Sequence, residues 1–205
     1  MKTNIPLPNS FLSLSKRFLD NGFSLYLIGG SSRDLLLGRF CRDFDLVTDA
    51  TPEQEKAFLP DADYTFSRFG TIKVNHEGDK FDIATFRKEE NYADFRHPKK
   101  IEFIKEIEVD SARRDFTINA IYIDSVKQIY DFHHGYEDLE NKLIRFIGDP
   151  DIRIREDPLR ILRAERFART LGFEIEKSSK EAIERNYALL DKLNPEKVKM
   201  EKKKG

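Results

Sequence analysis

The sequence LYLIGGSSRDLLLG at residues 25–38, followed by DFDLV at residues 43–47, predicts a strand, a short helix and a second strand. The apolar run at its start is typical of a buried strand, and the two glycines after it end that strand. Ser31 or Ser32 can cap a helix over Arg33–Leu37, and Gly38 is a typical stop. This stretch therefore has the alternation of a protein built from both helices and strands.

The segments on either side carry the patterns of further elements. Helices are predicted over residues 8–21, 111–119, 151–170 and 178–191, and Thr51-Pro52 is a further helix start. Strands are predicted over 71–75, 81–86, 101–104 and 121–130, the first two as a hairpin. The polar stretch at residues 88–100 has no clear period and is interpreted as a mobile loop. Strands gather in the first part of the chain and helices in the last. The order predicts an α+β head over residues 1–145 and an all-helical neck over residues 146–205.

The charge of the chain is balanced. Its 205 residues contain 36 Lys and Arg against 37 Asp and Glu, a formal net charge of −1. This excludes a protein that binds nucleic acid through bulk positive charge, but it allows a local basic surface. Residues 151–170 hold six Arg against four acids, and residues 195–205 hold five Lys against two Glu. The helical end is therefore the candidate contact for a nucleic-acid backbone.

Membrane and disulfide classes are not expected. No apolar run approaches the roughly 20 residues that a membrane helix needs, and the N-terminus MKTNIPLPNS has no apolar signal core. The one cysteine, Cys41, leaves no internal disulfide and no cysteine-based zinc site. A cytoplasmic compartment is the expectation.

Three acids are candidate metal ligands. Asp43 and Asp45 are two apart on a predicted strand, so their side chains point to the same face. Paired carboxylates repel unless a cation lies between them, and oxygen ligands suit Mg²⁺. Asp82 interrupts an apolar strand and needs a partner if it faces the core. The alternative is ordinary: solvated strand-end acids, with Asp82 on the polar face.

The glycine pair and its following arginine are candidates for phosphate binding. Gly29 and Gly30 let backbone N–H groups approach phosphate oxygens at the start of a helix. Arg33 adds a rigid fork of donors. The alternative is a plain turn between a strand and a helix, since neither a Walker A loop nor GxGxxG is present.

The segment RRDFTINA at residues 113–120 combines arginines, an acid and an amide. Arg114 is a candidate for phosphate, and Asp115 and Asn119 for ribose hydroxyls. The alternative is a helix with surface ion pairs.

The segment EDPLRILR at residues 156–163 is a candidate for base recognition. Asp157 can accept from an exocyclic amine while Arg160 donates to a ring nitrogen, an edge that cytosine and adenine share. Uracil and guanine present the reverse order, and each buried mismatch costs about 1–3 kcal/mol. The alternative is a helix laced with salt bridges.

Four motifs in order resemble those of class II tRNA nucleotidyltransferases and bacterial poly(A) polymerases, in the DNA polymerase beta superfamily. The first is Leu27–Gly38 with Asp43–Thr48, the second Arg113–Ala120, the third Asp131–Asp149, and the fourth Glu156-Asp157 with Arg160. Together they cover about residues 20–190. Ser32 stands where the family usually has an apolar residue, a change in packing. The resemblance implies a polymerase-beta-like head with a mixed sheet and flanking helices, followed by the helical neck.

The resemblance also implies a role for each matched residue. The carboxylates of Asp43 and Asp45 would hold Mg²⁺, with Asp82 as the third catalytic carboxylate. The remaining residues implied to bind the nucleotide are Gly29, Gly30, Arg33, Asp34, Arg114, Asp115, Asn119, Asp157, Arg160, Arg163 and Arg166.

The implied activity is template-independent addition of C and A to the 3′ end of tRNA from CTP and ATP, with release of pyrophosphate. Residues 87–98 resemble the family's flexible loop, which addition of the terminal A requires. A poly(A) polymerase or an A-adding enzyme is the alternative within the family, and a non-catalytic RNA- or nucleotide-binding module is the alternative outside enzymes. Body and tail domains that hold tRNA in the family are not expected within residues 1–205, so tight tRNA binding is not expected either.

Overall fold

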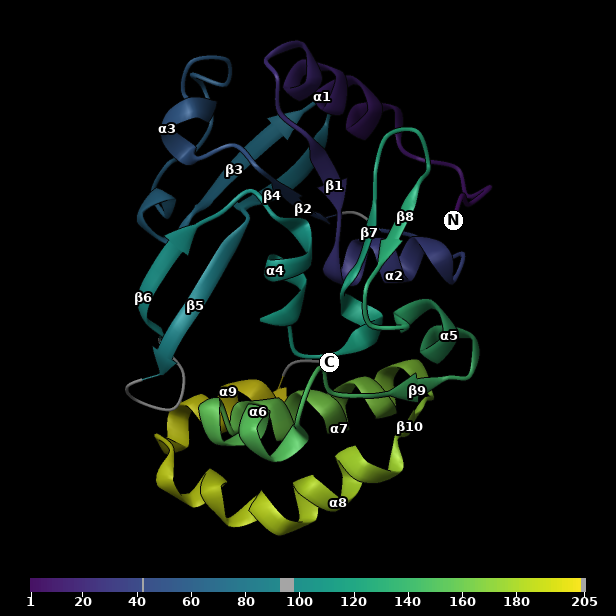
Figure 1. Ribbon diagram of the computed structural model, residues 1–205, viewed down its shortest axis with the longest axis vertical. Helices are drawn as coiled ribbons and strands as arrows, with labels where there is room; N and C mark the ends of the chain where they lie inside the picture. Colours follow the sequence, from purple (N-terminus) through teal and green to yellow (C-terminus); the bar gives the residue numbers. More distant parts are fainter. Residues whose placement is uncertain (42, 93–97, 204–205) are drawn as a thin grey trace. The chain divides into compact units, whose positions relative to one another are not determined.

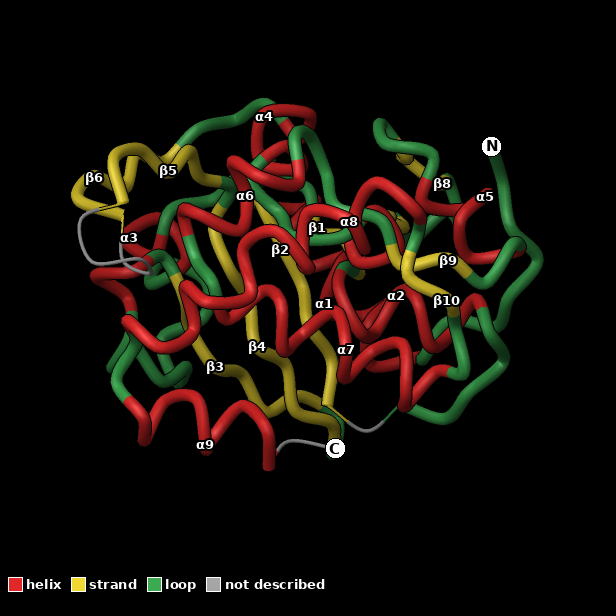
Figure 2. Tube along the Cα trace, turned by 90° about the horizontal axis from the view of Figure 1, so that it is seen from below, coloured by secondary structure: helices red, strands yellow, loops and turns green. Residues whose placement is uncertain are grey.

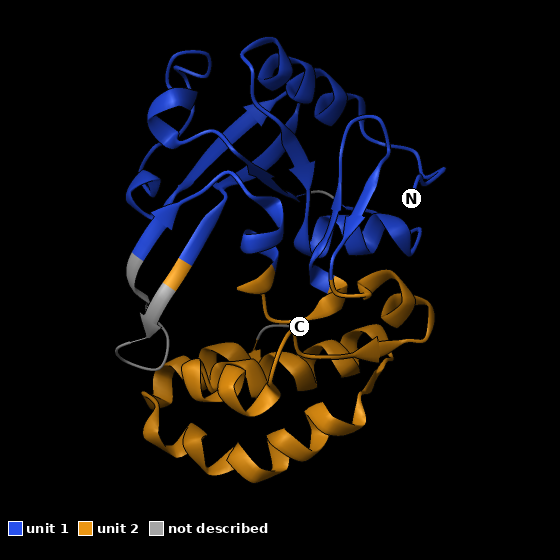
Figure 3. Cartoon of the chain, in the orientation of Figure 1, with its two compact units in different colours: residues 1–88, 101–111, 119–132 blue, residues 89–100, 112–118, 133–205 orange. Residues whose placement is uncertain are grey.

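The computed structural model describes residues 1–41, 43–92 and 98–203. The chain divides into two compact units, coloured separately in Figure 3. Unit 1 comprises residues 1–88, 101–111 and 119–132, and unit 2 comprises residues 89–100, 112–118 and 133–205. The head–neck boundary at residue 145 stays a prediction.

Unit 1 is built on a six-stranded sheet in the order β3-β4-β2-β1-β7-β8. Figure 2 shows β3, β4, β2 and β1 running side by side. The strands are β1 (Leu25–Leu27), β2 (Asp43–Thr48), β3 (Thr71–His76), β4 (Asp79–Thr85), β7 (Ile121–Ile123) and β8 (Ile129–Asp131). Only β2 and β4 pair in parallel among these neighbours. The sheet is therefore mixed, and the predicted α+β class is confirmed.

Short helices flank this sheet (Figure 1). They are α1 (Asn9–Asp20), α2 (Gly29–Leu36), α3 (Pro52–Glu55), the 3₁₀ turn η1 (Ser67–Phe69) and α4 (Ile107–Ala112). Helix α1 buries Phe11, Leu14 and Phe18 completely, as its helical spacing predicts. Helix α3 begins with a capping box between Thr51 and Gln54, which satisfies two backbone donors at its start.

Helix α2 begins earlier than predicted. It starts at Gly29 rather than at Arg33, and neither serine caps it. The Ser31 hydroxyl instead accepts a hydrogen bond from the backbone N–H of Asp45, at 2.7 Å. A serine within the first turn of α2 thus fastens strand β2 to the helix, which the sequence pattern alone did not indicate.

The predicted helix at 111–119 is wrong in extent. Helix α4 ends at Ala112, and only the 3₁₀ turn η2 (Thr117–Asn119) follows. The Arg153 guanidinium donates to the backbone carbonyls of Arg113 and Arg114, so these oxygens bond to a side chain. A buried arginine thus takes up carbonyl groups that a continuing helix would need.

The predicted loop at 88–100 is partly wrong. Strands β5 (Arg87–Tyr92) and β6 (Pro98–Phe103) form a two-stranded sheet of their own. Residues 93–97, in the middle of the predicted mobile loop, lie outside the described residues.

Unit 2 is mostly helical, with α7 in contact with both α6 and α9 (Figure 1). Its helices are α5 (Gly135–Glu140), α6 (Pro150–Glu156), α7 (Leu159–Leu171), α8 (Lys177–Asn186), the 3₁₀ helix η3 (Tyr187–Lys192) and α9 (Pro195–Lys203). Unit 2 also has a two-residue strand, β10 (Glu174–Ile175), that pairs in parallel with β9 (Leu143–Ile144), so residues 146–205 are not entirely helical as predicted.

The predicted helix at 151–170 is two helices, because the chain leaves the helical conformation at Asp157. Asp157 has φ −149° and ψ 94°, the extended conformation that a residue before proline prefers. Helix α7 then starts at Leu159, immediately after Pro158, and ends at Leu171, where Gly172 caps it in the left-handed conformation. In the described part of the chain, none of the helices has both the length and the apolar character to cross a membrane.

Gly70 gives a stability prediction. Its φ is +75°, and a Cβ added there would lie 2.5 Å from Cε1 of Phe103. We expect Gly70→Ala to lower the free energy of unfolding by about 2 kcal/mol or more, from left-handed strain of about 1–2 kcal/mol plus displacement of the ring. Gly22→Ala is the matched control, because Gly22 has φ +83° and a Cβ added there would have nothing within 4 Å. Urea unfolding measures the stability of both variants. Equal losses of unfolding free energy would contradict a steric contribution from the Phe103 ring.

Candidate active site

Strand β2 presents two aspartates on an open part of the sheet. Phe44 and Leu46 are buried, whereas Asp43 and Asp45 are exposed on the opposite face. Val47 shares the face of the aspartates and packs into a buried cluster with Ile28, Phe86 and Tyr122. Ile107 of α4 packs against the same cluster. The apolar cover thus ends before the two carboxylates, which remain open to solvent.

The register of the sheet places charged residues in two rows on this face. Lys73, Asp82 and Asp45 are directly opposite one another on β3, β4 and β2. Asn75, Lys80 and Asp43 form the neighbouring row on the same strands. All six residues are exposed. We call these six residues the carboxylate face.

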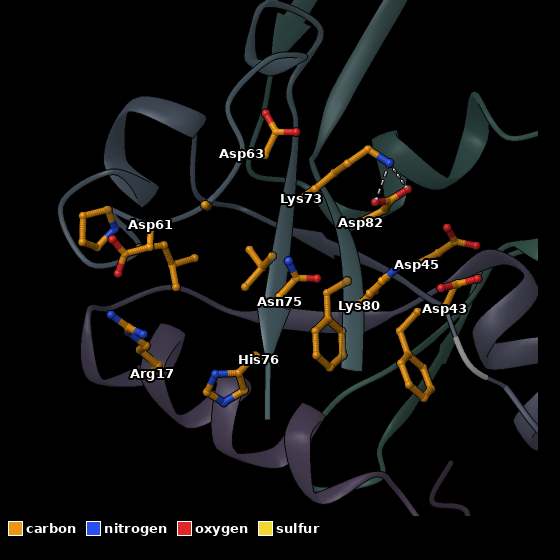
Figure 4. A pocket seen from close by; sticks show the side chains of 16 residues that line it. Arg17, Asp43, Asp45, Asp61, Asp63, Lys73, Asn75, His76, Lys80 and Asp82 are labelled. Carbon is orange, nitrogen blue, oxygen red and sulfur yellow. Dashed lines mark hydrogen bonds and ion pairs between the residues drawn. The ribbon is translucent and has the colours of Figure 1, made fainter. Parts of the chain in front are cut away.

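Asp82 is therefore neither a core residue nor a lone surface acid. The Lys73 ammonium lies 3.1 Å from Oδ1 and 3.2 Å from Oδ2 of Asp82. Figure 4 shows this ion pair together with Asp43 and Asp45. Asp82 thus lies on the exposed face of β4, as the alternative interpretation of the sequence predicts, and it pairs with a lysine on the adjacent strand.

The glycine pair lies directly against Asp45. A Cβ on Gly29 would be 3.3 Å from Oδ2 of Asp45, and one on Gly30 would be 3.8 Å from the same oxygen. Gly29 has φ +66°, a conformation that side chains rarely adopt. The turn into α2 therefore leaves open space beside this carboxylate, room that any larger residue would fill.

A pocket of about 660 Å³ opens on the carboxylate face (Figure 4). All six residues of the face line it, and Arg17, Asp61 and His76 add charge or polarity to its walls. The pocket is thus polar and carries both signs of charge, which suits a charged substrate better than an apolar ligand.

Arg33, Asp34 and Asn119 form a second group in unit 1. The Arg33 side chain donates from Nε to Asp34 at 2.9 Å and from Nη1 to the amide oxygen of Asn119 at 2.8 Å. Arg33 is only 7% exposed and Asn119 only 8%. The structure thus joins residues of the first and second sequence motifs, 86 positions apart, through one buried arginine.

Unit 2 holds the third group, around Arg163. Its guanidinium donates to Asp115 at 3.2 Å and to Asp157 at 2.9 Å. Burial alone would lower the pKa of Arg163, but the carboxylates of Asp115 and Asp157 outweigh it and raise the pKa. This arginine therefore stays charged and ties the second motif to the fourth.

Asp157 and Arg160, the two residues predicted to read the base, have different partners in unit 2. Asp157 pairs with Arg163, whereas the Arg160 guanidinium donates to Glu156 at 2.8 Å and to the carbonyl of Arg153 at 2.6 Å. The break at Asp157 ends the continuous helix on which i, i+3 neighbours would meet. Both Asp157 and Arg160 are nevertheless buried, at 6% and 4% exposure.

Two other predicted residues have contacts of their own. Arg166 pairs with Glu201 of α9 at 3.2 Å and lies over the ring of Phe167. Arg114 is half-buried, and its carbonyl accepts from Arg153. Arg166 thus links α7 to α9 within unit 2.

The residues present fit a divalent cation at Asp43 and Asp45. Two exposed carboxylates on one strand face, with the open space left by Gly29, match the one or two carboxylates that Mg²⁺ usually takes from protein. Asp82 is held by Lys73 instead, and within residues 1–41, 43–92 and 98–203 no group of three His, Cys, Asp or Glu side chains is gathered as a metal site. A cation here would complete its shell with water and phosphate oxygens.

Sequence reasoning missed Lys73, Lys80, Ser31 and Arg153. The alternation over 71–75 does place Lys73 on the polar face of its strand, a signal that was present. Pairing between β3 and β4 was also predicted, but its register decides that Lys73 meets Asp82. Arg153 gives no local signal, because its partners lie about 40 positions away.

The sequence is similar to those of curated CCA-adding enzymes. A CCA-adding enzyme of Lactobacillus helveticus (strain DPC 4571) is 43% identical over 182 residues, 89% of this chain and 46% of the relative. One of Geobacillus thermodenitrificans (strain NG80-2) is 40% identical over 193 residues, 94% of this chain and 48% of the relative. The chain spans about half the length of the curated relatives that it matches.

A solved structure agrees with this relation. The Bacillus stearothermophilus CCA-adding enzyme in complex with CTP superimposes with a TM-score of 0.85 and 35% identity, over 94% of this chain and 47% of that one. The family model described as the poly A polymerase head domain matches residues 25–145, more than half of the chain. That range contains the carboxylate face, the glycine turn and the second motif. The chain belongs to the family of the poly A polymerase head domain, as its motifs predict.

Proposed function

We propose that this chain is the nucleotidyltransferase part of an enzyme that adds C and A to the 3′ end of tRNA. The observation that carries the proposal is the placement of Asp43 and Asp45 beside the glycine turn, open to a charged pocket. The similarity to CCA-adding enzymes, including one in complex with CTP, supports it. So does a nucleotidyltransferase complexed with a primer tRNA and an ATP analogue, 29% identical with a TM-score of 0.75.

The reaction joins the RNA 3′-oxygen to the α-phosphorus of CTP or ATP. The bond between that phosphorus and the bridging oxygen breaks, pyrophosphate leaves, and the hydroxyl proton is lost. Asp43 and Asp45 would hold Mg²⁺, which when bound favours ionisation of the attacking hydroxyl and neutralises charge on the leaving group. The Gly29-Gly30 turn would let backbone N–H groups approach the triphosphate.

Arg33 and the second motif would position the nucleotide. Arg33 is fixed by Asp34 and Asn119, so its guanidinium is already ordered before any ligand binds. Asp34, Arg114, Asp115 and Asn119 remain proposed nucleotide contacts. A donor fixed in advance loses little side-chain entropy on binding phosphate.

Base selection would belong to the buried group in unit 2. Asp157 accepts from Arg163 through one oxygen and from the Leu159 N–H through the other, yet a carboxylate has about four acceptor sites. Asp157 can therefore also accept from the exocyclic amine of cytosine or adenine. Arg160 would donate to the ring nitrogen, with Arg163 and Arg166 supporting the pair.

Nucleotide choice gives a prediction on Asp157. We expect Asp157→Ala to lower the ratio of kcat/KM for CTP to that for UTP by roughly 10- to 100-fold, the effect of about 1–3 kcal/mol. The ratio is the readout because general damage to the fold lowers both rates alike. An unchanged ratio, with CTP still preferred, would show that Asp157 does not read the base.

The test of the function is incorporation of labelled CTP and ATP onto tRNA that ends in the discriminator base, C, CC or CCA. We expect C then A, and no addition to a finished CCA end. A single A added only to the CC end would indicate an A-adding enzyme, and a long A tail on generic RNA a poly(A) polymerase. Nucleotide binding without turnover would indicate a binding module. The cytoplasmic location expected from the sequence stays a prediction.

A further inference from the structure

The carboxylate face contains two lysines that the proposed chemistry does not use. Lys73 lies in the row of Asp45 and Asp82, and Lys80 lies in the row of Asp43. Both lysines are exposed and line the 660 Å³ pocket. Cations and carboxylates thus alternate over neighbouring positions on one open surface.

The ion pair of Lys73 with Asp82 adds little to stability. Their side chains are 48% and 50% exposed, and ion pairs so open to solvent contribute little to stability. Lys73 can therefore exchange the carboxylate for another anion at small cost. In the described part of the chain, Lys80 has no ion pair at all.

The spacing of the sheet fits an RNA end. Neighbouring strands lie about 4.8 Å apart, and Lys73 reaches back over β4 to the Asp82 carboxylate. Its ammonium therefore lies about one strand away from Asp45. A phosphodiester on the 5′ side of the last ribose is separated from the 3′-oxygen of that ribose by a similar span, one sugar ring.

We propose that Lys73, with Lys80 beside it, binds the last phosphodiester of the RNA strand whose 3′-hydroxyl is extended. This inference rests on the proposed function and names the residues that position the RNA end. Lys73 leaves Asp82 for the phosphate, which sets the carboxylate free beside the reacting hydroxyl. Lys73 is thus a positioning residue, and its ligand is a phosphate of single-stranded RNA.

The experiment measures RNA binding without turnover. A 5′-fluorescein RNA ending in CC is titrated with the whole 205-residue chain in EDTA, and anisotropy is followed at several salt concentrations. We expect Lys73→Met to weaken binding roughly 5- to 20-fold and to reduce the slope of log K against log salt by about 0.7, the share of one single-strand phosphate. Lys73→Arg should retain most of the binding.

The matched control is Lys16→Met. Lys16 also forms an exposed ion pair with an aspartate, Asp20, but it lies on α1 and does not line the pocket. We expect no change in RNA affinity or salt slope. Melting temperatures check that each variant is folded.

A modified RNA identifies the phosphate. A neutral methylphosphonate at the last linkage should weaken binding to the unsubstituted chain as much as Lys73→Met does, and the two changes together should cost no more than one. A methylphosphonate three linkages upstream should weaken RNA binding by the same factor in Lys73→Met as in the unsubstituted chain.

Three results would overturn the inference: an unchanged RNA affinity in Lys73→Met, full additivity at the last linkage, or no measurable RNA binding by the unsubstituted chain. A loss of CTP affinity equal to the loss of RNA affinity would also overturn it, by assigning the lysines to the triphosphate. Failure of the proposed function would give a different result. In that case RNA binding would still depend on Lys73, but neither CTP nor ATP would be incorporated.

Discussion

Asp43→Asn is expected to lower the rate of CTP incorporation by at least about 10²–10³-fold while the protein stays folded. The change keeps the shape of the side chain and removes its charge, so one of the two carboxylates proposed to hold Mg²⁺ becomes a weak ligand. Several kcal/mol of transition-state stabilisation depend on that ion, and each 1.36 kcal/mol is tenfold in rate. Single-turnover incorporation at saturating CTP measures the effect.

The control for this variant is Asp61→Asn. Asp61 is exposed and lines the same pocket, but it lies outside the strands that carry the carboxylate face. The loss of charge is the same, and we expect a rate within a few-fold of the unsubstituted chain. Both variants should keep their melting temperature to within a few degrees, because exposed substitutions usually change stability by less than about 0.5 kcal/mol. Near-normal incorporation by Asp43→Asn would remove the metal assignment.

Glu55→Gln is expected to change the pH dependence of stability in unit 1. Glu55 is only 1% exposed, and burial raises its pKa to about 8 from an ordinary value of 4.5. In the folded protein it keeps its proton up to about pH 8, whereas the unfolded chain loses that proton above pH 4.5. The unfolded state is therefore increasingly favoured as pH rises between these values.

The sign and size follow from this linkage. Below pH 4.5 the proton is bound in both states and Glu55 has no effect on pH dependence. From there to about pH 8 the free energy of unfolding falls by up to about 5 kcal/mol, and above pH 8 the penalty stays constant. Glutamine cannot ionise, so Glu55→Gln should remove most of this slope.

Urea unfolding at half-unit steps from pH 4.5 to 8.5 tests the expectation. The stability difference between Glu55→Gln and the unsubstituted chain should grow with pH and level off near pH 8. Glu53→Gln is the matched control, since Glu53 lies in the same helix with its side chain 84% exposed. Parallel curves for Glu55→Gln and the unsubstituted chain would show that Glu55 ionises in the folded state as readily as in the unfolded one.

Local patterns determined much of the fold. Helical spacing predicts helix α1, alternation predicts the β3–β4 hairpin, and the Thr51-Pro52 pair predicts the start of α3. Each of these signals depends on residues within one turn or one hairpin. The strand pair on either side of Gly29-Gly30 was predicted for the same reason. The errors fall where a distant partner decides: Arg153 takes the carbonyls of Arg113 and Arg114 and ends α4 early, and the proline after Asp157 divides a continuous pattern into two helices.

The sequence by itself determined the family, through four motifs in order, and the residue types that the proposed chemistry needs. Only the tertiary structure decided which of them meet. Sheet register sets Lys73 against Asp82 and Asp82 beside Asp45, and a shift of one residue would turn these side chains to the other face. Packing likewise pairs Asp157 with Arg163, and Arg160 with Glu156. Partners of this kind are chosen by contacts between segments far apart in the chain, which no local pattern specifies.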